Sequence, residues 1–345
     1  MAVSRISGEL ALIDRIRRRT VGQHSRALQL GIGDDCAILR VPRGHELVVT
    51  TDFSLEGRHF RRDWHTPQSI GHRTLARGLS DLAAMGATPL AAFLSLALPR
   101  SAAQDQRFLG KFIDGFLDGL LSLAKQHSVP LAGGDTSESP SDAVLADIVL
   151  LGATPTGKAL RRSTARPGDL LYVTGAIGGA AAELEQLLAT PPSEPWPLNP
   201  GPSSHPHFFP QPRLAVGQAL LRRRLATAAM DLSDGLSTDL THLCEASSVA
   251  AELDEAALPL HLLTQTLLRD AADQLHAALH GGEDYELLFT ARPGTKLSRS
   301  LAGIPITCIG RILEKQPRKP RLTLISPTGK RSPLKPQGWE HLRSN

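Results

Sequence analysis

The spacing of apolar residues along the chain predicts an alternation of helices and strands. An apolar stripe with arginines on the other faces indicates an amphipathic helix at residues 8–19. The same helical period runs through residues 69–85 and 107–127. Shorter apolar runs that are typical of strands occur at residues 37–41, 46–52, 91–99, 130–135 and 143–154. The run at 130–135 ends in Gly-Gly-Asp, so we expect that strand to end in a ligand loop.

The pattern restarts after residues 153–169, which contain two prolines and several glycines. This restart predicts two domains, residues 1–153 and 154–345. The predicted elements of the second are a strand leading into a glycine-rich helix start at 170–179, helices at Arg213–Thr227 and Gly235–Ser247, and a strand at 285–291. Residues 191–212 are dense in proline, so we expect an exposed excursion or a mobile loop outside any core. The chain beyond residue 291 is interpreted as a basic, proline-rich tail.

The composition excludes several classes of protein. Three cysteines in 345 residues, Cys36, Cys244 and Cys308, lie far apart without a CxxC spacing, which argues against a zinc site or a disulfide framework and suits a reducing compartment. Cys36 is expected to be a small packed residue. The chain shows no signal peptide and no 18-residue apolar run, so we expect a cytoplasmic protein without a membrane span.

The charge pattern bears on the choice of partner. The net charge of +4 is small, and the short arginine runs at residues 17–19 and 222–224 fit solvated helix faces. We expect no nucleic-acid partner, because the basic stripe typical of one is not evident.

Two glycine motifs resemble nucleotide-binding fingerprints without matching them. Residues 152–159, GATPTGKA, have the spacing of a phosphate-binding P-loop, but Ala159 replaces the hydroxyl that would hold magnesium. Residues 175–180, GAIGGA, follow a predicted strand but lack the GxGxxG spacing of a dinucleotide site. We interpret the second as close packing of a helix on a strand.

Acidic residues recur beside glycines and at the ends of apolar runs, where strands end and helices begin. They are Asp34, Asp35, Asp52, Asp81, Asp135, Asp231, Asp234, Glu283 and Asp284. Two adjacent carboxylates repel each other by about 1 kcal/mol in water at 4 Å. A pair such as the one in GIGDD, residues 31–35, therefore needs either solvent or a cation. Two alternatives stay open: the acids are unrelated caps and turns, and Asp81, inside an alanine-rich helix, is an outward-facing charge.

Oxygen ligands without Cys or His favour magnesium, which takes only one or two carboxylates plus waters and phosphate oxygens. So many acids predict several magnesium ions, and several ions predict a polyphosphate ligand. Ser233 and Asp234 open a predicted helix, whose N-terminus suits phosphate or metal-bound water.

The motifs together resemble those of the thiamine-monophosphate kinases. The resemblance rests, in chain order, on GIGDDCA, TTD, GRHF, LSDLAAMGA, GGDT, LRRSTARPGD, YVTG, DLSDG, GGEDYEL and GWEH. The wider superfamily includes aminoimidazole ribonucleotide synthetase, but GGEDYEL and the tail tryptophan favour the kinase. The resemblance implies an α/β protein with mixed sheets in the two-domain fold of that superfamily, dimerised through the N-terminal sheet.

The resemblance also implies roles for individual residues. The magnesium ligands would be Asp35, Thr50, Thr51, Asp52, Asp81, Asp135, Asp231 and Asp234. ATP would contact Gly134, Asp135, Arg162 and Ser233. Thiamine phosphate would contact His59, Glu283 and Trp339. Whether K⁺ assists is left open, as is the number of magnesium ions.

Three departures from the family pattern stand out. Members often carry an aromatic residue shortly before GGDT, near the nucleotide, whereas His127 is the nearest ring here. Met230 precedes DLSDG in place of the commoner isoleucine. The proline-rich segment 191–212 looks longer than usual.

The implied reaction transfers phosphate from ATP to thiamine monophosphate, the last step in making thiamine diphosphate. A phosphate monoester has a second pKa near 6, so the acceptor is already mostly a dianion at pH 7 and needs no general base. We therefore expect direct in-line transfer with no catalytic side chain, driven by positioning and charge neutralisation. Two alternatives are another ATP-dependent reaction of the superfamily, such as purine ring closure, and a non-catalytic magnesium–nucleotide sensor.

Overall fold

The computed structural model describes residues 8–20, 22, 25–192 and 204–339, without the side chains of 102, 103, 106 and 107. The chain forms two compact units. Unit 1 contains the described residues up to 82, 88–157 and 191–192. Unit 2 contains residues 83–87, 158–190 and 204–339.

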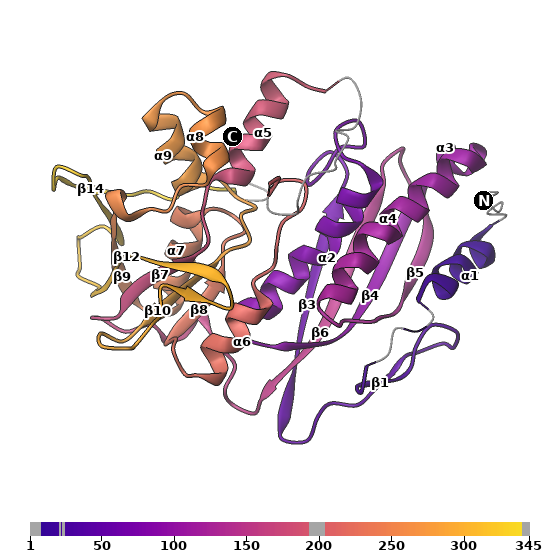
Figure 1. Ribbon diagram of the computed structural model, residues 1–345, viewed down its shortest axis with the longest axis horizontal. Helices are drawn as coiled ribbons and strands as arrows, with labels where there is room; N and C mark the ends of the chain where they lie inside the picture. Colours follow the sequence, from indigo (N-terminus) through magenta and orange to yellow (C-terminus); the bar gives the residue numbers. More distant parts are fainter. Residues whose placement is uncertain (1–7, 21, 23–24, 193–203, 340–345) are drawn as a thin grey trace. The chain divides into compact units, whose positions relative to one another are not determined.

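Unit 1 is built on a four-stranded sheet in the order β3-β6-β4-β5 (Figure 1). Its elements are α1 (Glu9–Thr20), β1 (Leu28–Leu30), β2 (Ile38–Leu39), β3 (His45–Leu55), α2 (Pro67–Ala84), β4 (Thr88–Pro99), α3 (Arg100–Gln104), α4 (Gln106–Gln126), β5 (Leu131–Ser139) and β6 (Leu145–Pro155). Strand β6 is antiparallel to both of its neighbours, whereas β4 and β5 are parallel. The sheet is therefore mixed, as expected.

Helices α2 and α4 cover one face of this sheet (Figure 1). Alternate residues of β6, Ala146, Ile148 and Leu150, are buried beneath them, because side chains of a strand point to opposite faces in turn. The two helices approach each other closely at Gly71, where a Cβ would overlap the carbonyl oxygen of Phe116. Glycine at this position is what allows so close a helix contact.

Unit 2 is built on an eight-stranded sheet in the order β14-β13-β9-β12-β7-β10-β8, with β11 paired to β12. Its elements are η1 (Arg162–Thr164), β7 (Leu170–Thr174), α5 (Gly179–Ala189), α6 (Leu214–Arg222), β8 (Ala228–Asp231), α7 (Leu236–Ala246), β9 (Val249–Asp254), η2 (Glu255–Ala257), α8 (Leu262–Leu267), α9 (Ala271–His280), β10 (Leu287–Ala291), β11 (Ser300–Leu301), β12 (Ile304–Glu314), β13 (Leu322–Ile325) and β14 (Arg331–Pro333). Strands β13 and β9 are parallel, and the other pairings are antiparallel.

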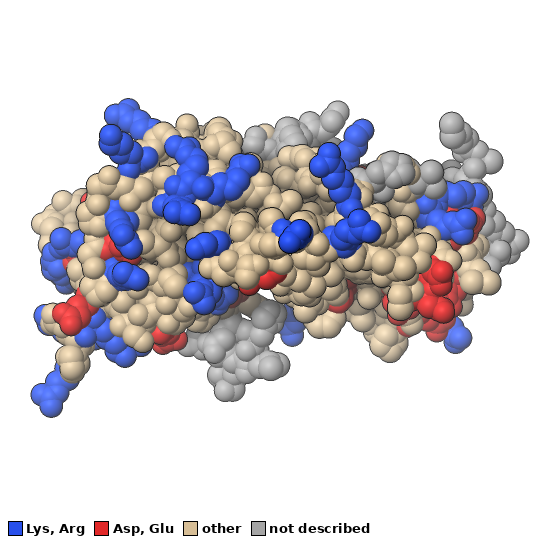
Figure 2. Space-filling view, turned by 90° about the horizontal axis from the view of Figure 1, so that it is seen from below, with Lys and Arg blue, Asp and Glu red and all other residues tan. Residues whose placement is uncertain are grey.

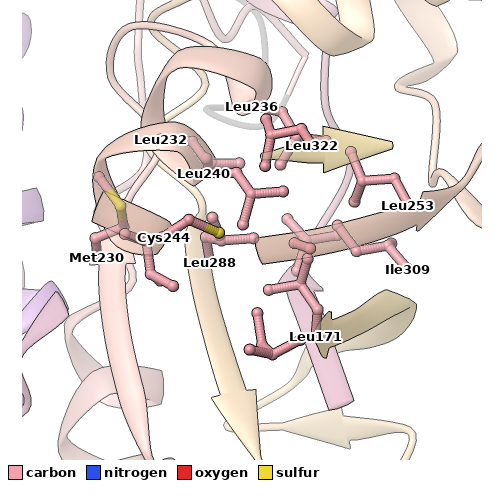
Figure 3. Close-up of a cluster of buried hydrophobic side chains, with 14 of the residues drawn as sticks. Leu171, Met230, Leu232, Leu236, Leu240, Cys244, Leu253, Leu288, Ile309 and Leu322 are labelled. Atoms are coloured by element: carbon pink, nitrogen blue, oxygen red, sulfur yellow. The ribbon is translucent and has the colours of Figure 1, made fainter. Parts of the chain in front are cut away.

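The core of unit 2 lies between α7 and the sheet. Figure 3 shows Leu236, Leu240 and Cys244 of the helix facing Leu171 and Leu288 of the strands. The cluster consists of aliphatic side chains and two sulfur-containing ones, in line with the low aromatic content of the chain. This packing holds the start of α7 against the end of β8, and the acidic loop between them is part of the candidate site.

Most helices and strands predicted from periodicity are confirmed, including the placement of Asp81 near the end of α2. The strand expected at residues 130–135 is longer than predicted, because β5 continues through Gly134 and Asp135 to Ser139 in parallel pairing with β4. The helix expected at Arg213–Thr227 ends at Arg222, and Arg224 follows in the left-handed region with φ of 54°.

Two predictions about irregular segments are wrong. The chain beyond residue 291 is not a tail, since β12 pairs with both β7 and β9 in the middle of the sheet. Residues 193–203 of the proline-rich segment lie outside the described residues. The described part, 204–212, does enter the core, since Phe208 is only 1% exposed. The prolines near it carry no backbone N–H, so burying them leaves no donor unpaired.

The cysteines of the described chain are all free. Cys36 is exposed, so the expectation that it packs as a small core residue is wrong. None of the described helices combines the length and the apolarity needed to cross a membrane.

Candidate functional site

Unit 1 contains a cavity of about 840 Å³ between the GIGDD loop and strand β5. It is lined by residues 31–37 of the loop, by residues 131–136 of β5 and by Ile13 and Ile16 of α1. The cavity thus brings Asp35 together with Gly134 and Asp135, which come about a hundred residues later in the sequence. Helix α1 is held beside it by Arg15, whose Nε donates to Asp114 Oδ1 of α4 at 2.8 Å.

The aromatic residue that lines this cavity is Phe93 of β4. His127, the nearest ring before GGDT in the sequence, is not among the lining residues. Sequence reasoning missed Phe93, because it lies inside an apolar strand and nothing in the pattern distinguishes it. A Cβ on Gly133 would come 2.8 Å from its ring, so a larger residue there would crowd Phe93. Gly134 has φ of 149°, and a Cβ there would overlap the Leu94 carbonyl oxygen.

A second acidic group lies where β3 meets α2. The Thr50 hydroxyl donates to Asp81, and Arg77, one turn earlier on α2, donates to Asp52 Oδ1 at 3.3 Å. Asp81 therefore faces the sheet, and the alternative of an outward-facing charge is wrong. Burial raises the pKa of Asp52 to about 6, Arg77 opposes this shift, and Asp81 and Asp147 add to it. The one arginine does not offset the surrounding negative charge, and this is the environment that a cation would relieve.

The structure does not bring Thr51 into this group. Successive side chains of β3 point to opposite faces, so Thr50 and Asp52 share one face and Thr51 lies on the other. The Thr51 hydroxyl donates instead to Asp147 Oδ1 of β6 at 2.8 Å.

Unit 2 holds the remaining acids at the junction of β8 and α7. Asp231 is the last residue of β8 and is 6% exposed, and Asp234 lies in the loop that follows. Asp239, in the first turn of α7, accepts the backbone N–H groups of Asp234 and Gly235 at 3.1 Å each. Burial raises the pKa of Asp239 well above its ordinary value, and the charges of Asp231 and Asp234 raise it further. Sequence reasoning missed Asp239, although an acid five residues after Asp234 was a visible signal.

The GGED loop is joined to this junction through backbone hydrogen bonds. Glu283 N–H donates to the Ser233 carbonyl at 2.8 Å, and Tyr285 N–H donates to the Leu232 carbonyl at the same distance. Glu283 itself is in the left-handed region, with φ of 67°. A non-glycine residue held in that region is strained, and such strain is most common at functional sites.

The segment before the C-terminus lies on the same loop. Trp339 N–H donates to the Asp234 carbonyl at 3.0 Å, and Gly338 N–H donates to the Thr238 hydroxyl at 3.1 Å. Trp339 is 51% exposed, so its ring is available to a ligand. The structure thus brings together Ser233, Asp234, Glu283 and Trp339, which come from three distant stretches of sequence.

The adjacent acid Asp284 has a different task. Its carboxylate accepts the N–H of Gly178 at 2.7 Å at the start of α5, and burial raises its pKa to about 7. The GAIGGA motif is therefore a packed helix start that a side chain caps, but its Gly178 packs against α9 and not against a strand as expected. The P-loop-like stretch 152–159 likewise begins within β6 and is followed only by the three-residue 3₁₀ helix η1, not by the α-helix that a P-loop requires.

The predicted sites of unit 1 and unit 2 each include residues outside these clusters. His59 lies in unit 1, where its Nδ1 accepts the N–H of Leu55 at 3.0 Å and its carbonyl accepts from Arg73 at 2.8 Å. Arg162, in η1 of unit 2, is exposed, and its carbonyl accepts the Ser247 hydroxyl at 2.7 Å.

The donor set fits magnesium better than a metal held by protein alone. Within the described part of the chain, no three His, Cys, Asp or Glu side chains are grouped to hold one ion. Magnesium needs only one or two carboxylates when phosphate oxygens and waters complete its shell. Asp52 with Asp81, and Asp231 with Asp234, offer such pairs.

One face of the surface bears on the question of a nucleic-acid partner. On the face in Figure 2, Lys and Arg side chains of the described chain are scattered and form no continuous stripe. A duplex-binding protein would be expected to gather them on one face.

Comparison with known proteins gives the class of this fold and site. Residues 33–159 match the family "AIR synthase related protein, N-terminal domain", and residues 166–298 match "AIR synthase related protein, C-terminal domain". The chain is thus an AIR synthase related protein of two α/β domains.

Closer relatives narrow the family. Thiamine-monophosphate kinase of Salmonella typhimurium is 39% identical over 315 residues, which cover 88% of this chain and 90% of the relative. The crystal structure of thiamine-monophosphate kinase from Stenotrophomonas maltophilia K279a is 38% identical with a TM-score of 0.77, over 92% of this chain and 96% of that one. AaThiL complexed with AMPPCP and TMP is 29% identical with a TM-score of 0.72, over 97% of each chain. The chain belongs to the thiamine-monophosphate kinase family.

Proposed function

We propose that the protein transfers a phosphoryl group from ATP to thiamine monophosphate and releases thiamine diphosphate and ADP. The observation that carries this proposal is the joining of Ser233, Asp234, Glu283 and Trp339 in one loop site of unit 2. The relatives named thiamine-monophosphate kinase support it, as does the complex of AaThiL with an ATP analogue and TMP.

Several of the residues would bind magnesium. The ligands that the geometry supports are Asp35 and Asp135 in the cavity, Thr50, Asp52 and Asp81 on β3 and α2, and Asp231 and Asp234 at the start of α7. Thr51, whose hydroxyl donates to Asp147, stays a proposed ligand on the family resemblance alone. Bound magnesium would neutralise charge between the two polyanionic substrates. A requirement for K⁺ stays open.

The nucleotide would occupy the cavity of unit 1, where Phe93 offers an aromatic face and Gly134 allows close approach to the backbone. Ser233 and Arg162 are proposed as ATP contacts on the family resemblance. The thiazolium ring of thiamine carries a permanent positive charge. Trp339 would attract it by about 0.5–2 kcal/mol through a cation–π contact, and the Glu283 carboxylate would offset the charge. His59 is the third proposed thiamine phosphate contact.

No side chain needs to act as a general base, because the acceptor phosphate is mostly a dianion at pH 7. What the chain must supply is alignment of the two phosphates and compensation of their charge. We therefore propose direct transfer without a phosphorylated enzyme intermediate.

We also propose that the working form is a homodimer with domains near residues 1–153 and 154–345. The outer face of the unit 1 sheet exposes Leu47, Val49 and Phe53 on alternate positions of β3, at 44%, 59% and 62%. Thr51 and its partner Asp147 interrupt this row, but exposed apolar side chains gathered on one face are typical of an interface. Light scattering should give twice the chain mass of 37.0 kDa, and a monomeric mass at micromolar concentration would contradict the dimer.

The function is tested by chromatographic detection of thiamine diphosphate. Purified protein is given ATP and Mg²⁺ with either thiamine monophosphate or free thiamine, and product is expected from the monophosphate alone. Labelled ATP in the same mixture, quenched early, should leave no label on the protein. ADP release only with a purine precursor would favour a sister enzyme, and tight ATP binding without turnover on any acceptor would favour a nucleotide sensor.

Gly338 should control access of thiamine monophosphate through Trp339. A Cβ at this position would overlap the Asp234 carbonyl oxygen, so Gly338→Ala must displace the segment that carries the indole ring. We expect the KM for thiamine monophosphate to rise about tenfold, as one lost contact of about 1.4 kcal/mol would give, with the KM for ATP nearly unchanged. Trp339→Ala should have the same effect.

The matched control is Gln337→Ala, since Gln337 is exposed and its backbone contact survives the change. A larger rise in the KM for ATP than for thiamine monophosphate would remove Trp339 from the acceptor site.

A further inference from the structure

The end of the proline-rich segment is fastened to helix α5 by a buried carboxylate. Glu183 is 6% exposed, and each of its two oxygens has a partner in this segment. Its Oε1 lies 2.5 Å from His205 Nδ1, and its Oε2 accepts the backbone N–H of His207 at 2.9 Å. Burial raises the pKa of Glu183, and the two histidines oppose that shift.

This anchorage shapes a tight turn over residues 205–209. The N–H groups of Phe208 and Phe209 both donate to the His205 carbonyl, at 3.1 and 2.8 Å. The Phe208 ring is buried, and the rings of His205 and His207 meet it edge-on, with centroids 6.3 and 5.5 Å away. The His207 ring therefore has one packed orientation and is only 3% exposed.

In that orientation His207 faces the GGED loop. Its Nδ1 lies 3.3 Å from Glu283 Oε2. The backbone of Glu283 is already held by Ser233, but a glutamate side chain has three further rotatable bonds. A buried imidazole beside Glu283 Oε2 restricts the direction of this side chain.

We propose that His207, itself held by Glu183, is a positioning residue that aims the Glu283 carboxylate at the thiamine moiety of the acceptor. The turn at residues 205–209 then belongs to the acceptor side of the site. This inference rests on the proposed function, because it takes Glu283 as a contact of thiamine monophosphate.

The first test replaces the ring without removing its bulk. His207→Phe keeps the packing against Phe208 and loses the polar Nδ1, so the KM for thiamine monophosphate should rise about tenfold while the KM for ATP stays within twofold. His207→Asn places an amide nitrogen near the former Nδ1 and should restore most of the loss. His242→Phe, at an exposed site on α7, is the matched control and should change neither constant.

A double-mutant cycle separates positioning from general damage. In a Glu283→Ala background, His207→Phe should have no further effect on the KM for thiamine monophosphate, because the group that it positions is gone. Equal effects in both backgrounds, an unchanged KM for thiamine monophosphate in the single variant, or an equal rise in the KM for ATP would each overturn the proposal.

A measurement on the unaltered protein covers the case in which His207→Phe does not fold. The ¹⁵N spectrum of the ring should show a proton on His207 Nδ1, and a bare Nδ1 would overturn the contact with Glu283. The two proposals fail differently. An unaltered protein that neither binds nor phosphorylates thiamine monophosphate refutes the function and with it the positioning role, whereas an active protein whose His207 variants behave normally refutes the positioning role alone.

Discussion

Replacing Asp52 with asparagine should nearly abolish phosphoryl transfer and, at the same time, stabilise the metal-free protein at pH 8. Asp52 is largely buried beside Asp81 and Asp147, with Arg77 as its cationic partner at 3.3 Å. Its ionised form is therefore disfavoured in the folded protein. The same uncompensated negative charge would attract magnesium. Asp52 therefore lowers the stability of the metal-free protein but favours cation binding.

The sign and the size of this expected stabilisation follow from the pKa of Asp52. The folded pKa of about 6 lies above the ordinary value of 3.8, so the folded state binds this proton more tightly than the unfolded state. The stability that this proton contributes is complete below pH 3.8 and is lost as the pH rises through 6. Asparagine does not titrate, so its advantage over aspartate should be near zero at pH 4 and about 1–3 kcal/mol at pH 8.

Urea unfolding in the presence of a chelator, at pH 4 and pH 8, measures this difference, and Asp14→Asn is the control. Asp14 is half exposed in an i,i+4 pair with Arg18, a kind of pair worth only about 0.3–0.5 kcal/mol. Near-normal turnover in Asp52→Asn would remove Asp52 from the metal set. A variant less stable than the parent protein at pH 8 would refute the account of its charge.

Removing the charge of Arg213 should destabilise unit 2 by about 3–5 kcal/mol, because it leaves a buried carboxylate without a counterion. Glu286 is 3% exposed. Arg213 donates to its carboxylate from Nε at 2.7 Å and from a second guanidinium nitrogen. The Thr174 hydroxyl also donates to this carboxylate, at 2.5 Å. Arg213→Met keeps much of the side-chain volume, so the expected loss comes mainly from the charge.

The measurement is the free energy of unfolding in urea. Glu286→Gln combined with Arg213→Met should be more stable than Arg213→Met alone, since the neutral amide no longer needs a counterion. Arg223→Met, at an exposed position one residue beyond α6, serves as the control and should change stability by less than about 0.5 kcal/mol. A loss for Arg213→Met as small as the control's would show that the ion pair contributes little.

Local patterns predicted the parts of the fold whose signal lies within one element. The helical period of α2 was enough to place Asp81 near its end, and the apolar run at residues 46–52 was enough to predict β3. The alternation of side chains along β3 places the Thr51 hydroxyl on the other face from Thr50, where it donates to Asp147, so the ligand role of Thr51 stays a prediction of the family resemblance.

The failures concern segments whose partners are distant in sequence. Strand β13 pairs in parallel with β9, about seventy residues away, so its composition alone resembled a tail. Phe208 is buried because Glu183 of α5 holds the turn around it, although proline density predicted an exposed excursion. Strand β5 continues past GGD because β4 supplies hydrogen-bond partners out to Pro99.

For this protein, the sequence by itself predicted which residue types would carry the chemistry. It placed Asp231 and Asp234 correctly between a strand and a helix, but Asp52 and Asp135 lie inside strands. It also determined the family, because the order of the motifs can be read directly along the sequence. Only the tertiary structure decided that Trp339 lies on the Asp234 loop, that Phe93 lines the cavity and that His207 faces Glu283. Those contacts depend on packing between segments that are distant in sequence. Local propensity does not specify which distant surface will bury a side chain.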